Sequence, residues 1–118
     1  MASYMSKASQ IAQQYTQDQF WKVFDKLPEK IQDALLSSQT FDTVNAIAKS
    51  NGVPNRATRI IYYVDLILMG IVPITLLRET IQEESGIREE LARKIATEIR
   101  DKIFMPVAEE LRQIHGLK

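Results

Sequence analysis

An almost unbroken apolar run, IIYYVDLILMGIVPITLL at residues 60–77, sets the strongest limit on what this chain can fold into. A membrane-spanning helix needs about 20 consecutive apolar residues, whereas Gly70 and Pro73 divide this run into shorter pieces. A helix that is apolar on all sides is otherwise found at the centre of a helical bundle. We therefore predict a corner between two buried helices, with no transmembrane span and no peripheral membrane contact.

Helical patterns occupy the rest of the chain. Val53-Pro54 begins the central helix, predicted over about 55–70, because proline suits the first turn of a helix. Pro106 lacks the N–H that would bond to the Lys102 carbonyl, so the last long helix should kink or split there. Before that proline, one apolar face repeats at every fourth residue, through Ile87, Leu91, Ile95, Ile99 and Ile103.

These patterns predict an all-α fold, a compact six- to seven-helix bundle around a buried central helix at about 55–70. A length of 118 residues is close to the commonest domain size, and no linker divides the chain. The 45% hydrophobic and 25% charged residues are typical of a globular protein. We therefore expect a single helical domain over residues 1–118.

The first predicted helix, at about 7–26, carries an apolar stripe that includes Ile11, Tyr15 and Phe20, with glutamines on the opposite face. This helix could dock on its own domain or on a second copy of the chain. Both arrangements are open at this point, so the segment is either a docking or a dimerisation extension.

The composition excludes several kinds of site. There is no cysteine, which rules out disulfides, thiolate metal ligands and a cysteine nucleophile. The 15 basic and 15 acidic side chains balance, so the chain lacks the positive field of a typical nucleic-acid-binding protein. The N-terminus shows no secretory signal pattern, and we expect a cytoplasmic location.

Catalytic motifs are also missing. His115 is the only histidine, and Arg112 stands where a Glu-x-x-His metal motif requires glutamate. No glycine-rich phosphate loop or nucleophile elbow occurs. We predict no catalytic, cofactor-binding or metal-binding residues, and no enzymatic activity.

Four residues are the candidates for contact with a partner: Trp21, Tyr62, Asp65 and Met69. Trp21 lies about 100° away from the apolar stripe of its helix, and it either packs in the core or contacts a partner, because aromatic side chains supply large buried area in both settings. The other three share one side of the central helix, so that side should reach the surface. Because a carboxylate buried without a partner is costly, we expect Asp65 to cap a neighbouring helix or to pair with an arginine.

An alternative function is DNA binding by a helix-turn-helix-like element at 44–64. The spacing of Ala48 and Gly52 fits such an element. The residues that would face the groove of DNA are Asn55, Arg56 and Arg59. Against this alternative, the second helix soon becomes apolar, which leaves few side chains to read bases.

The C-terminal half, LILMG followed by ARKIATEIRDKIFMPVAEELRQIHG, resembles small uncharacterised helical proteins of candidate-phyla bacteria. The shared pattern is A-x-x-I-A, then I-F-x-P, then I-H-G. The resemblance implies an α-helical domain and a bacterial, cytoplasmic origin, and it implies no site. Together these observations predict a non-enzymatic interaction or scaffolding module whose partner is another protein or a second copy of the chain, and not nucleic acid.

Overall fold

The apolar run at residues 60–77 forms a buried corner at the centre of the molecule. In the computed structural model, which describes residues 6–116, a 3₁₀ turn at Pro54–Arg56 leads into α5 (Ala57–Leu68). The chain then reverses at Gly70, whose φ is +77°. A second 3₁₀ turn, Ile74–Leu76, leads into α6 (Leu77–Ser85). The predicted all-α bundle around a buried central helix is confirmed.

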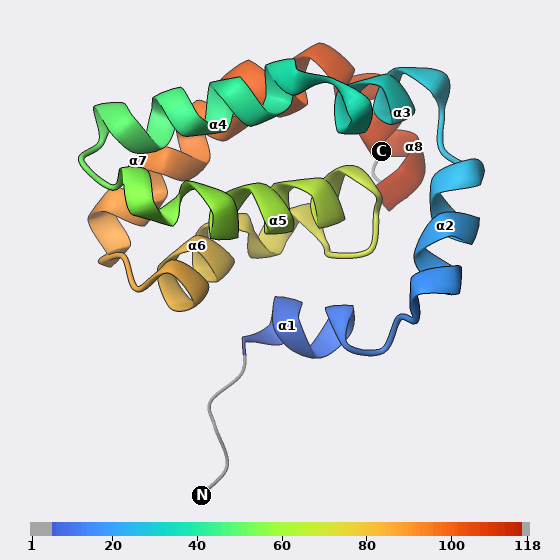
Figure 1. Cartoon of the computed structure of the whole chain (residues 1–118), viewed down its shortest axis with the longest axis horizontal. Helices are drawn as coiled ribbons and strands as arrows, with labels where there is room; N and C mark the ends of the chain where they lie inside the picture. Colours follow the sequence, from blue (N-terminus) through green and yellow to red (C-terminus); the bar gives the residue numbers. More distant parts are fainter. Residues whose placement is uncertain (1–5, 117–118) are drawn as a thin grey trace, which may run out of the picture.

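Two further helices complete the core of the bundle. α4 (Ser38–Ser50) runs along one side of it, and α7 (Glu89–Ile99) packs against both α4 and α6 (Figure 1). Branched aliphatic side chains from these helices fill the space between them. The fully buried members include Ile47, Ile60, Val64, Ile67, Leu68, Leu77, Ile81, Ile95 and Ile99. This core positions the outward face of α5 rigidly.

Pro106 splits the last helical region, as expected. After α7, the chain widens into a π-helical turn at Arg100–Phe104, in which the Met105 N–H donates to the Arg100 carbonyl, five residues back. A 3₁₀ turn at Met105–Val107 follows, and α8 (Ala108–His115) comes next. The wider turn accommodates Pro106, which has no N–H to donate to the Lys102 carbonyl and whose ring cannot fit closely against the preceding turn.

The prediction of one continuous helix at about 7–26 is wrong. The chain forms α1 (Lys7–Ala12) and α2 (Gln17–Asp25), separated by a turn. Thr16 starts α2 with a reciprocal capping box: its hydroxyl accepts the Gln19 N–H at 3.2 Å, and its own N–H donates to the Gln19 side chain at 2.7 Å. This cap begins a new helix where apolar spacing alone suggested continuity.

The two N-terminal helices differ in how they meet the bundle. α1 lies across α5, with Ala8 and Ala12 buried, and the Ser6 hydroxyl donates to the Glu84 carboxylate at 2.6 Å. α1 therefore docks on its own chain. α2 stands at the edge of the bundle without a fully buried residue, and the chain returns to the bundle through α3 (Glu29–Leu36) (Figure 1).

Within residues 6–116, each helix is too short or too polar to cross a membrane.

Candidate functional site

An apolar hollow lies where α2, α3 and the C-terminal end of α5 meet. We call it the aromatic groove, and its volume is about 220 Å³. Trp21 is 56% exposed and Leu36 is 73% exposed, which is unusual for side chains of this size. The residues that line the groove are Phe20, Trp21, Phe24, Leu35, Leu36, Asp65 and Met69.

Local contacts hold α2 beside the groove. The Gln32 side chain of α3 donates to the Phe24 carbonyl at 2.8 Å and so ties the end of α2 to the next helix. The rings of Trp21 and Phe24 meet edge to face, with centroids 5.7 Å apart and planes at 78°. A second ring contact, between Tyr15 and Phe20, also has a centroid distance of 5.7 Å. The aromatic wall is thus fixed by stacking and one hydrogen bond.

Asp65 supplies the charge of the groove. Its carboxylate has no ion pair or hydrogen bond with any residue between 6 and 116, so the expected helix cap or arginine partner is absent from this part of the chain. Burial alone raises the pKa of Asp65 from 3.8 to about 6, because a low-dielectric environment disfavours the charged form. The fold holds this acid against a mainly apolar surface.

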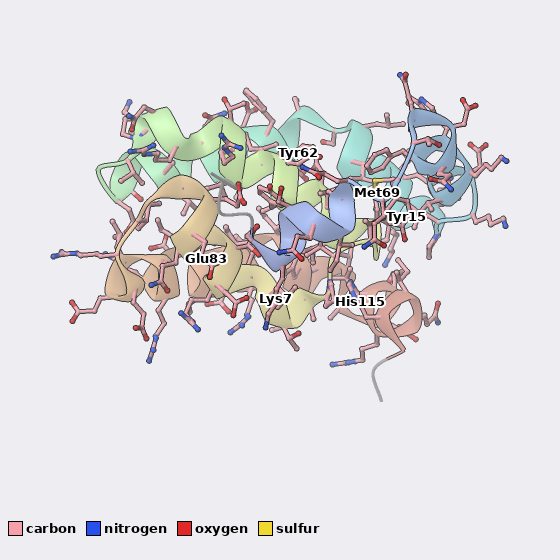
Figure 2. The ribbon with its side chains drawn as sticks, turned by 90° about the horizontal axis from the view of Figure 1, so that it is seen from below. Lys7, Tyr15, Tyr62, Met69, Glu83 and His115 are labelled. Carbon is pink, nitrogen blue, oxygen red and sulfur yellow. The ribbon has the colours of Figure 1, made fainter. Side chains whose placement is uncertain are left out.

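Three of the four predicted contact residues come together in the aromatic groove. Trp21 reaches it from α2, Asp65 reaches it from α5, and Met69 reaches it from the position directly after α5. Tyr62, which is 47% exposed, lies closer to the other end of α5 and does not line the groove. Figure 2 shows Tyr62 and Met69 separated along α5, with Met69 at the end nearer to α2.

Tyr62 instead lines a second depression, which we call the arginine hollow. Its other lining residues are Asn55, Arg56, Thr58, Arg59, Glu84 and Ser85, so it gathers the residues of the DNA-binding alternative. Arg59 lies 3.6 Å from the Glu84 carboxylate, which also accepts the Ser6 hydroxyl. A carboxylate in the hollow opposes the approach of a phosphate.

His115 has a structural contact. Its Nε2 donates to the Ile67 carbonyl at 2.8 Å, which also accepts the Gly70 N–H at 3.0 Å, and so ties α8 to the C-terminal end of α5. In the part of the chain that the structure describes, no three His, Cys, Asp or Glu side chains converge on a possible metal position.

Several groove residues are not among the predicted contact residues. Phe20 is expected on the apolar stripe of the first predicted helix, and the sequence pattern does not single out Phe24, Leu35 or Leu36 for contact with a partner. Helical periodicity identifies an apolar face without saying what covers it. The adjacent leucines offered one usable signal, because two neighbouring residues point in directions about 100° apart and both seldom face the same core.

Comparison with known proteins gives no match: no protein-family model, curated protein or solved structure is significantly similar to this chain. The resemblance to helical proteins of candidate-phyla bacteria stays a prediction.

Proposed function

We propose that this protein is a non-enzymatic interaction module of the cytoplasm, and that its aromatic groove receives a segment of another protein. The observation that supports this most directly is the exposure of Trp21 and Leu36 on two walls of one apolar hollow. Exposed apolar side chains that gather in a concave patch are typical of protein interfaces.

The size of the groove favours a protein side chain over a small molecule. Sites for drug-sized ligands enclose about 300–1,000 Å³, and this groove encloses about 220 Å³. Its open shape leaves Leu36 largely in solvent, where the flanking residues of a partner segment could cover it. A partner that buries one or two anchor side chains here would gain most of its affinity from them.

Site-specific photo-crosslinking in the source cell tests this proposal. A photoreactive phenylalanine analogue at Leu36 reports the groove, and the same analogue at Phe41, which is 52% exposed and does not line the groove, is the matched control. We expect a discrete adduct from position 36 that a Trp21→Ala change abolishes, and no such adduct from position 41.

Three results would overturn the proposal. Adducts of equal yield at both positions, or none at position 36, would mean that the groove has no partner. An adduct with the mass of two copies of this chain would identify self-association in place of a different protein.

DNA binding is the second candidate function, and it has one observation in its favour: Asn55, Arg56 and Arg59 line the same hollow. Electrophoretic titration with duplex DNA at low salt separates the two candidates. Binding that weakens steeply with salt, and that an Arg56→Ala, Arg59→Ala double variant loses, would favour DNA. If the groove is the functional surface, the double variant should leave the position 36 adduct intact.

A further inference from the structure

Three features of the aromatic groove favour a cationic ligand: a single acidic side chain, the lack of a partner for it among residues 6–116, and aromatic walls. Of the described residues that line it, only Asp65 is charged, and the remainder are aromatic or aliphatic. The Asp65 carboxylate has no partner among residues 6–116. Asp65 is partly buried, so its carboxylate loses part of its hydration and gains no ion pair in return. A cation that entered the groove would supply that missing attraction.

The aromatic wall favours the same charge. The faces of Trp and Phe rings attract cations through the ring quadrupole, and Trp is the strongest of the side chains in this respect. Because Trp21 and Phe24 meet at 78°, their ring faces point in different directions. Since Asp65, Trp21 and Phe24 line the same groove, a cationic group that binds the carboxylate there enters a hollow with aromatic walls.

Between the two protein cations, arginine fits this surface better than lysine. Guanidinium is planar, stacks on aromatic rings and can bind a carboxylate through two parallel hydrogen bonds. It is also more weakly hydrated than ammonium, so its entry into a hollow lined by Leu35 and Met69 costs less. Its methylene stem can lie along the aliphatic part of the wall.

We propose that the aromatic groove binds an arginine side chain of the partner protein, with the guanidinium on Asp65 and the stem against Trp21 and Met69. This inference rests on the proposed function, since it names the chemistry of the residue that the partner inserts.

Two small probes of similar shape, one cationic and one neutral, test the inference. Butylguanidinium carries the head group and stem of arginine, and butylurea is its neutral counterpart. Trp21 is the only tryptophan of the chain, so its fluorescence reports the groove directly. The buffer is set about two pH units above the pKa of Asp65, so that the carboxylate is ionised.

Butylguanidinium should change the Trp21 emission in a saturable way, with an affinity at least about tenfold higher than that of butylurea. Asp65→Asn, which keeps the side-chain shape and removes the charge, should abolish this preference. Asp42→Asn is the control for general charge effects, because Asp42 is exposed and lies outside the groove. It should leave both affinities unchanged.

Equal binding of the two probes, no saturable binding of butylguanidinium, or full binding by Asp65→Asn would each overturn the inference. The crosslinking experiment separates this failure from failure of the proposed function. If the adduct at position 36 persists in Asp65→Asn, the groove binds its partner without an arginine anchor. If butylguanidinium binds as expected and no adduct forms, the cation site exists and the protein-docking proposal is wrong.

Discussion

At the scale of single residues, the partly buried carboxylate of Asp65 destabilises the fold at neutral pH. Burial raises the pKa of its carboxyl to about 6, and no neighbouring charge contributes to the shift. The folded protein therefore binds this proton more tightly than the unfolded chain does. In consequence, the ionised carboxylate lowers the free energy of unfolding at neutral pH, and this cost disappears as the pH falls through about 6 to below 3.8.

Asp65→Asn should for this reason stabilise the protein at neutral pH. The full shift corresponds to about 3 kcal/mol, and residual solvent screening reduces the expected gain to about 1–2 kcal/mol at pH 7. Urea denaturation of both proteins across the acidic range measures the effect. The gain should shrink as the pH falls and vanish near pH 4; a gain that stays constant with pH would show that burial of the charge is not its cause.

Gly70 connects α5 to α8 through a close contact. Its φ of +77° disfavours any side chain, and a Cβ at this position would overlap the Ile114 side chain. Gly52 has the same φ of +77° with nothing within 4 Å of the equivalent Cβ, so it isolates the backbone effect.

We expect Gly52→Ala to cost about 1–2 kcal/mol from backbone strain alone. Gly70→Ala should cost about 1–3 kcal/mol more, because overpacking adds to the strain. Thermal or urea unfolding of the two variants gives the difference directly. Equal costs would mean that α8 does not pack on the corner as described.

At the scale of elements, α2 is the helix most dependent on its own ends. It contributes no fully buried residue, and its start is defined by the Thr16 and Gln19 capping box. Helices with little buried surface open locally, without unfolding of the whole domain. Because α2 forms one wall of the aromatic groove, the groove keeps its shape only while α2 is folded.

Thr16→Ala should therefore loosen α2 selectively. The loss of the cap costs about 1 kcal/mol, which should raise the amide exchange rates of α2 about fivefold and leave those of α5 unchanged. Thr97→Ala is the matched control, since its hydroxyl donates to Arg93 within α7 and caps no helix start. Equal acceleration in α5 would show that α2 does not open independently.

At the scale of the whole molecule, one aliphatic core around α5 supports the fold. Leu68 has no exposed surface, and Leu36 is 73% exposed. Leu68→Ala should cost about 2–5 kcal/mol in free energy of unfolding, the usual range for a buried leucine. Leu36→Ala should cost less than about 0.5 kcal/mol, while it weakens capture of the partner at the groove. Chemical denaturation measures the free energy of unfolding of both variants. Similar decreases for the two would mean that Leu68 is not part of the core.

Part of the site was accessible from sequence. Trp21 stood off the stripe of its helix, and Asp65 and Met69 shared the outward side of α5; all three line the groove. Tyr62 shares that side of α5 but lines the arginine hollow. The sequence pattern did not distinguish the two hollows, because periodicity gives the direction of a side chain around a helix and says less about its position along the helix. The adjacent pair Leu35 and Leu36 indicates that one leucine leaves the core, and only the tertiary structure decides that Leu36 is the exposed one.

The sequence by itself determined the all-α fold, the buried α5 and the breaks at Gly70 and Pro106. Each follows from local chemistry: apolar spacing, a residue that accepts positive φ, and a residue without an N–H. Only the tertiary structure decided that α1 folds back onto its own chain, that α2 stands apart, and that Asp65 faces aromatic rings without a counter-ion. Those outcomes depend on contacts between segments far apart in the chain, and local patterns carry no information about which segments meet.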